Sequence, residues 1–129
     1  SSSKVNRREL EDASISELGH NPSCGDEITL NLKIKDGIIE DASYTGIGCA
    51  ISQASTSMMI DIIKGKNLEE AKDLTTTFIS MIKSEIDDED ELEKLEDAIV
   101  LQNISMMPAR VKCAVLAWHT LDNIIEISK

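Results

Sequence analysis

Three cysteines and one aspartate are the side chains of this chain whose chemistry stands out. Cys24 and Asp26 are separated by a single glycine, Cys49 follows a Gly-Ile-Gly turn, and Cys113 lies in the last apolar stretch. Thiolates and a carboxylate are donors with which zinc fills a tetrahedral site. We therefore take these four residues as candidate ligands of one zinc ion. The alternative, from the residues alone, is two buried cysteines and one exposed, reactive cysteine.

The surroundings of each cysteine indicate a different role at such a site. The glycine turn predicts that Cys49 lies at or just before a helix N-terminus, where unpaired backbone N–H groups stabilise a thiolate. Cys113 lies about 120° from the centre of the apolar stripe of its predicted helix and faces away from that stripe. Arg110, three residues earlier, is the cation that we expect to support the negatively charged ligands. Cys24 lies on a loop beside glycine, which predicts that it moves more easily than the other two.

Composition limits the class of protein. A chain of 129 residues suffices for one domain with a single core. No apolar run is long enough to span a bilayer, and the first residues do not resemble a signal peptide. Three cysteines in an acidic chain argue against a disulfide framework, so we expect a cytoplasmic protein. The net charge of −11 and the few aromatic residues lead us to expect no nucleic-acid partner. The lack of a long apolar run leads us to expect no membrane partner.

A predicted hairpin explains how two of the cysteines meet. Alternating residues predict a strand over residues 28–34, and an Asp-Gly turn then predicts a second strand over residues 38–45. In an antiparallel hairpin, the start of the first strand lies beside the end of the second. The loop of Cys24 therefore lies next to the loop of Cys49. Residues 1–20 are polar and mixed, and we expect them to form an irregular arm.

After the hairpin, the apolar spacing becomes helical. We expect helices over residues 50–64 and 67–82, a short helix that opens near residues 87–88, and a final helix from Pro108 to about residue 127. Between Glu85 and Asp97 the chain has nine acids and one lysine. We interpret this acidic segment as a solvated surface, remote from the metal, whose apolar residues Leu92, Leu95 and Ile99 face the body of the protein.

Ordered motifs carry a resemblance to a known family. Residues 21–26 read Asn-Pro-Ser-Cys-Gly-Asp, residues 48–55 read Gly-Cys-Ala-Ile-Ser-Gln-Ala-Ser, and residues 108–118 read Pro-Ala-Arg-Val-Lys-Cys-Ala-Val-Leu-Ala-Trp. From about Leu10 to its C-terminus the chain resembles the IscU/SufU family (NifU N-terminal-like) of iron–sulfur cluster assembly proteins. Two features resemble the SufU branch. Lys112 stands where IscU proteins place a histidine, and the connection from Cys49 to Cys113 is longer, with the extra length at about residues 75–107.

The resemblance implies an α+β fold, in which a small antiparallel sheet has helices packed on one face, as in SufE/IscU-like proteins. It implies a single domain over residues 1–129, with residues 1–20 as an N-terminal arm and residues 75–107 as a SufU-type insertion. The helix with which family members usually begin has no counterpart here, which indicates a truncated start.

The resemblance also implies a function. In a SufU-type protein, zinc is held by Cys24, Asp26, Cys49 and Cys113, and Cys24 accepts persulfide sulfur from a SufS-like cysteine desulfurase. The sulfur then passes to downstream cluster-assembly proteins, so the activity is that of a zinc-dependent sulfurtransferase. The alternative is an IscU-type scaffold, which is no enzyme and binds iron or a nascent iron–sulfur cluster. A purely structural zinc domain is the third interpretation.

Overall fold

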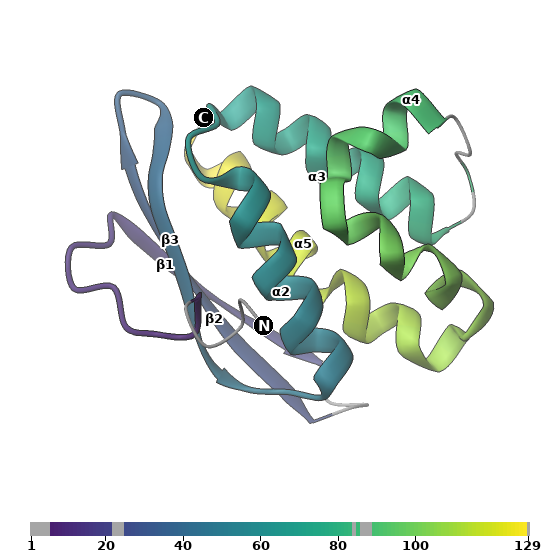
Figure 1. Ribbon diagram of the computed structural model, residues 1–129. Helices are drawn as coiled ribbons and strands as arrows, with labels where there is room; N and C mark the ends of the chain where they lie inside the picture. Colours follow the sequence, from purple (N-terminus) through teal and green to yellow (C-terminus); the bar gives the residue numbers. More distant parts are fainter. Residues whose placement is uncertain (1–5, 22–24, 84, 86–88, 129) are drawn as a thin grey trace.

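A three-stranded antiparallel sheet with helices on one of its faces makes up the structure, a computed structural model that describes residues 6–21, 25–83, 85 and 89–128. The strands are β1 (Ile15–Asn21), β2 (Asp26–Lys35) and β3 (Ile38–Ile47), in the order β1-β2-β3. The helices are α2 (Ala50–Ile63), α3 (Leu68–Ile82), α4 (Glu89–Leu92), η1 (Glu93–Met106) and α5 (Pro108–Ser128). Figure 1 shows the strands on the left and the helices on the right. The predicted α+β class is confirmed.

The central and third strands form the predicted hairpin. Leu30 of β2 lies opposite Tyr44 of β3, and Glu27 lies opposite Ile47. Both strands are longer than the alternating pattern indicated, because their main-chain pairing continues past the alternating residues. The start of β2 and the end of β3 therefore lie side by side, as the hairpin prediction requires.

The first strand corrects one expectation. We expected residues 1–20 to form an irregular arm, but Ile15–Asn21 pair with β2 along their whole length and form an edge of the sheet. Their two large apolar residues, Ile15 and Leu18, lie an odd number of positions apart and so point to opposite faces of the strand. Leu18 is exposed. Main-chain pairing with a neighbouring strand, rather than an alternating apolar pattern, defines this element.

The helix boundaries agree closely with the predictions. Helix α2 begins directly after Cys49, α3 begins after Asn67 with a capping box to Glu70, and α5 begins at Pro108. The helix start predicted near residues 87–88 lies outside the described residues. Helix α4 is described from Glu89 and continues into η1, a stretch of 3₁₀ geometry that is kinked at Glu96.

Most of the described acids in the acidic segment are exposed. The side chains of Glu85, Glu89 and Glu93 are exposed, whereas Leu92 and Leu95 are buried, as predicted. The expectation for Ile99 falls on a side chain outside the described ones. The segment is therefore a charged surface over an apolar underside.

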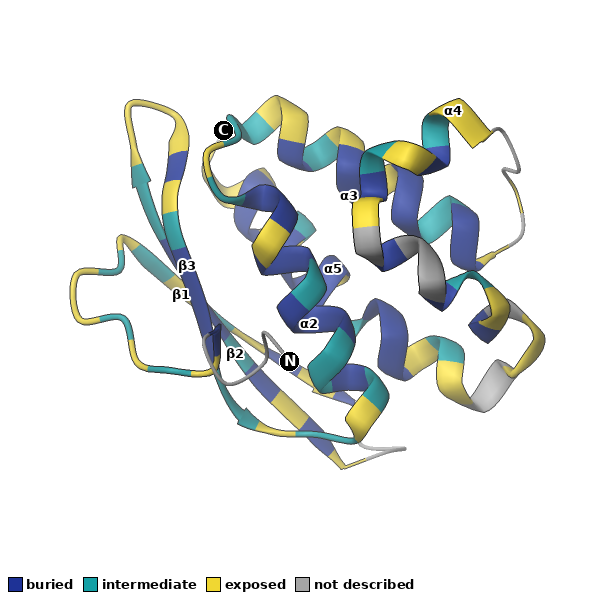
Figure 2. Ribbon diagram, in the orientation of Figure 1, coloured by how far each residue is buried: buried dark blue, intermediate teal, exposed yellow. Residues whose placement is uncertain are grey.

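The helices form two layers on the sheet. Helix α2 packs on β3 and α5 packs on β1 and β2, while α3 and η1 lie on the side of these helices that faces away from the sheet (Figure 1). Figure 2 shows buried positions along the helix surfaces that face one another and the sheet. Isoleucine, leucine and methionine supply most of this core. Among the described helices, none is both long and apolar enough to cross a membrane.

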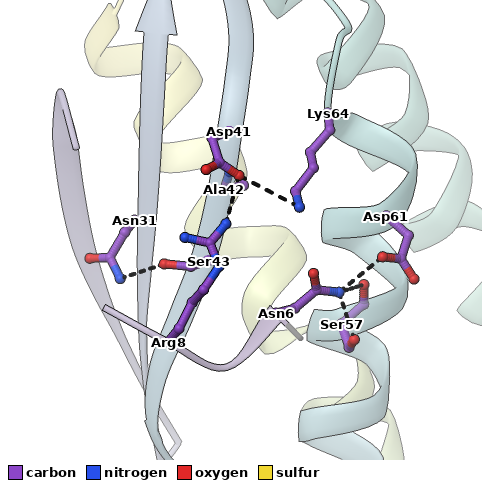
Figure 3. Close-up of polar contacts among 9 residues, drawn as sticks. All are labelled: Asn6, Arg8, Asn31, Asp41, Ala42, Ser43, Ser57, Asp61 and Lys64. Atoms are coloured by element: carbon purple, nitrogen blue, oxygen red, sulfur yellow. Dashed lines mark hydrogen bonds and ion pairs between the residues drawn. The ribbon is translucent and has the colours of Figure 1, made fainter. Parts of the chain in front are cut away.

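An N-terminal strap, residues 6–8, joins β3 to α2 (Figure 3). The buried Asn6 amide nitrogen lies 2.8 Å from Ser57 Oγ and 2.9 Å from Asp61 Oδ1, both on α2. The Arg8 backbone N–H donates to the carbonyl of Tyr44 on β3, and the Arg8 guanidinium lies 2.8 Å from Asp41 Oδ1. The strap thus fixes the edge of the sheet against the helix that follows it.

The Asp41 carboxylate makes this strap sensitive to acid. Partial burial alone would raise its pKa, but the hydrogen bond from Arg8, the Ala42 backbone N–H and the charges of Arg8 and Lys64 together lower it. A lowered folded-state pKa contributes stability above the ordinary carboxyl pKa of about 4, and this stability is lost as the pH falls through the folded-state value. We expect Asp41→Asn to reduce the fall in unfolding free energy below about pH 4.

Urea unfolding between pH 3 and pH 7 measures this effect. Asp36→Asn, in the exposed hairpin turn, removes the same charge away from the strap and serves as the control. An unchanged pH dependence in Asp41→Asn would show that the ion pair contributes nothing.

Candidate metal centre

Asp26, Cys49 and Cys113 come together at the end of the sheet where β2 begins. Their ligand atoms, one carboxylate oxygen and two Sγ atoms, all lie within 4.8 Å of one another. Asp26 is the first residue of β2, Cys49 immediately precedes α2, and Cys113 is in the second turn of α5. In the part of the chain that the structure describes, this is the one group of three or more such side chains with that spacing.

Cys49 is held by the N-terminus of α2, as predicted. It is the N-cap residue, and its Sγ accepts a hydrogen bond from the backbone N–H of Ser52 at 3.4 Å. Its own backbone N–H donates to Asp26 Oδ1 at 2.8 Å. These two hydrogen bonds fix the positions of the Cys49 sulfur and the Asp26 carboxyl group relative to the start of α2. Helix and strand are thereby joined through the candidate ligands themselves.

Asp26 provides the test of whether a cation fits. The side chain is fully buried, and its Oδ2 has no hydrogen-bond partner among the described residues. A buried carboxylate oxygen without a partner is destabilising, and a bound cation removes that penalty. Two sulfur atoms and one oxygen are a donor set that suits zinc or iron. The residues present therefore fit a metal ion of this kind.

Cys113 is positioned by a hydrogen-bonded link between α2 and α5. Ser55 Oγ donates to the carbonyl of Ala114 at 2.5 Å, and Trp118 Nε1 donates to Ser55 Oγ at 3.0 Å. The Trp118 ring stacks on Phe78 with a centroid distance of 4.2 Å. The side chains of Ser55, Phe78 and Trp118 are all buried. This link sets the register between the helix that begins at Cys49 and the helix that carries Cys113.

The other two predicted site residues, Cys24 and Arg110, are not part of this cluster of described ligand atoms. Cys24, the fourth predicted ligand, lies outside the described residues. Arg110 is exposed in the first turn of α5, three residues before Cys113, and its role as a supporting cation stays a prediction. The sequence interpretation did not single out Ser52. The signal for it was its position three residues after the N-cap cysteine, where a side chain returns to the cap.

The geometry agrees with comparisons to known proteins. The family model described as NifU-like N terminal domain matches residues 4–126. The chain therefore belongs to the NifU-like N terminal domain family. It is 45% identical over 124 residues to the iron-sulfur cluster assembly scaffold protein IscU of Thermotoga maritima, covering 96% of this chain and 85% of that protein.

A second relative is named a sulfurtransferase and not a scaffold protein. The zinc-dependent sulfurtransferase SufU of Bacillus subtilis is 42% identical over 118 residues, covering 91% of this chain and 78% of that protein. Among solved structures, a protein from Fervidobacterium islandicum, described as an iron-sulfur cluster assembly scaffold protein for the SUF system, superposes with a TM-score of 0.87 at 38% identity. That superposition covers 93% of this chain and 86% of the other. The family resemblance that the motifs indicated is confirmed.

Proposed function

We propose that this protein acts in iron–sulfur cluster assembly as a SufU-type, zinc-dependent acceptor of persulfide sulfur from a cysteine desulfurase. The observation that carries the proposal is the cluster of Asp26, Cys49 and Cys113 around a buried carboxylate oxygen without a described partner. The relatives named scaffold and sulfurtransferase support cluster assembly as the setting. The zinc-dependent relative supports the choice of metal.

Four side chains would hold the metal. An Asp26 carboxylate oxygen, Cys49 Sγ and Cys113 Sγ are the described donors, and Cys24 is the fourth. Oδ2 is the Asp26 oxygen that has no hydrogen-bond partner among the described residues. Cys24 precedes Asp26 by two residues, so chain connectivity alone keeps their Cα atoms within about 7 Å. Bound zinc would keep the coordinating thiols deprotonated at neutral pH. Three thiolates and one carboxylate complete a tetrahedral set.

Cys24 is the residue to which we assign sulfur acceptance. Its thiolate attacks the outer sulfur of the persulfide on the desulfurase, a new S–S bond forms on Cys24, and the desulfurase cysteine leaves as a thiolate. The transfer needs no added oxidant or reductant. Cys49 is restrained as a helix cap, and Cys113 is buried within a helix. Both are therefore less suited to move toward a partner protein than a residue on a loop.

The second candidate is an IscU-type scaffold, which takes iron and a nascent cluster as its cargo. The same donors suit iron, and the relative from Thermotoga maritima has the scaffold name. Lys112, in place of the histidine expected in IscU proteins, favours the sulfur acceptor. Its side chain is exposed on the turn of α5 that carries Cys113.

One experiment separates the two. The zinc-loaded protein is incubated with a SufS-like cysteine desulfurase and cysteine, and persulfide is mapped by mass spectrometry. We expect one added sulfur on the peptide that contains Cys24. Parallel reconstitution with ferrous iron and sulfide tests the scaffold. A stable cluster chromophore without persulfide on Cys24 would favour the scaffold and contradict our proposal.

A further inference from the structure

Ser52 has a buried hydroxyl group that the fold does not use. Its side chain is 1% exposed, and its Oγ has no hydrogen-bond partner among the residues that the structure describes. The backbone N–H of the same residue donates to Cys49 Sγ. A buried hydroxyl without a partner is destabilising, so its presence beside the candidate ligands calls for an explanation in terms of what binds there.

Comparison of two helix starts in this chain shows why the hydroxyl has no partner. At α3 the capping box is complete, because Glu70 N–H donates to Asn67 and the Glu70 side chain accepts the Asn67 backbone N–H at 3.1 Å. At α2, Ser52 occupies the position that corresponds to Glu70. Here the N-cap N–H is accepted instead by Asp26 from the distant strand β2. The Cys49 backbone N–H, which would be the usual partner of the Ser52 side chain, therefore already donates to Asp26.

The hydroxyl lies on the side of Gly48 where Asp26 also lies. The position that a Cβ atom would occupy on Gly48 is 3.1 Å from Asp26 Oδ1 and 3.2 Å from Ser52 Oγ. Only a glycine leaves this space open, since a methyl group there would press on both side chains. Rotation about the single χ1 angle of Ser52 would move Oγ between staggered positions.

We propose that Ser52 is a positioning residue whose hydroxyl donates to the Asp26 carboxylate when metal binds, and so keeps Oδ2 directed at the metal. Oδ1 would then accept from both Ser52 and the Cys49 backbone N–H. Groups that orient a metal ligand in this way typically change metal affinity by about 10- to 100-fold when removed. The inference rests on the metal site proposed above and concerns which residue orients its carboxylate.

The proposal predicts effects of opposite sign in the metal-free and zinc-bound proteins. In the metal-free protein, Ser52→Ala removes an unpaired buried hydroxyl, so its urea midpoint should equal or exceed that of the wild type. In the zinc-bound protein, the same change should weaken zinc binding by roughly 10-fold. A side chain with a merely structural role would change both properties in the same direction.

The control is Ser57→Ala on the same helix. Ser57 is also buried, but its Oγ accepts a hydrogen bond from Asn6, away from the site. We expect this variant to lower the urea midpoint and to leave zinc affinity unchanged.

Zinc affinity is measured by competition with a chromophoric chelator, and stability by urea unfolding of each protein with and without zinc. Wild-type affinity in Ser52→Ala would overturn the role of Ser52 while the metal site stands. A urea midpoint of metal-free Ser52→Ala well below the wild type would show that the hydroxyl serves the fold instead. Failure of the wild type to bind zinc would overturn the metal site itself, and with it this inference.

Discussion

Cys24→Ala is expected to lose sulfur acceptance completely, even when zinc is supplied in saturating amounts. The variant lacks the thiolate on which the new S–S bond forms, and neither of the two described cysteines is suited to replace it. Cys49 caps α2 and accepts a hydrogen bond from Ser52, and Cys113 is 1% exposed. Persulfide mapping after turnover with a desulfurase measures the loss.

The other two cysteine variants are the controls for this prediction. Cys49→Ala and Cys113→Ala each also lack one candidate zinc ligand, so the loss of a ligand is common to all three proteins. With saturating zinc, these two should still carry sulfur on Cys24, at a reduced rate. Full transfer by Cys24→Ala, or sulfur mapped mainly to Cys49 in the wild type, would refute the assignment.

Cys113→Ala is expected to bind zinc far more weakly than the wild type. Structural zinc sites contribute about 10–16 kcal/mol in total, so one of four ligands accounts for about 2.5–4 kcal/mol. This corresponds to an affinity about 100- to 1,000-fold weaker. Loss of one thiolate also leaves Asp26 with a weakly held cation beside its buried oxygen. Metal analysis of the purified variant and chelator competition both report the change.

A folding control accompanies this measurement. Cys113→Ser keeps a side chain of similar size, and circular dichroism with urea unfolding establishes whether each variant is native before zinc is measured. Stoichiometric zinc in a folded Cys113→Ala protein, with wild-type affinity, would exclude Cys113 as a ligand. Zinc loss in Cys113→Ser as well would tie the effect to sulfur and not to a cavity.

Much of the site followed from the sequence because local signals determine its geometry. An Asp-Gly turn sets the hairpin register, and the register places Asp26 beside the residues that lead to Cys49. The glycine turn and the apolar spacing that follows it place Cys49 at a helix N-terminus. The period of the last helix turns Cys113 away from its apolar stripe. Each of these signals depends on only a few neighbouring residues, so each could be recognised in the sequence alone.

Strand β1 was not predicted because its residue types are determined by packing against α5, which is distant in the sequence. The position opposite Ile28 is Gly19, and a Cβ atom there would lie 2.2 Å from Thr120 Oγ1 of α5. Close packing by α5 therefore requires a glycine where an alternating strand would present an apolar side chain. The inward-pointing residue Glu17 weakens the pattern further. Contacts between residues a hundred positions apart have no local signature. The same holds for Ser52, whose hydroxyl matters only through its relation to Asp26.

The link between α2 and α5 has an experimental use. The chain contains a single tryptophan, Trp118, and this residue both donates to Ser55 and stacks on Phe78. Its intrinsic fluorescence therefore reports on one location, the junction between the helix that begins at Cys49 and the helix that carries Cys113. A zinc titration followed at tryptophan emission would detect any shift of one helix along the other without an added label. An unchanged spectrum on zinc binding would indicate a preformed site, and a changed spectrum would indicate that the surroundings of Trp118 between the two helices change when zinc binds.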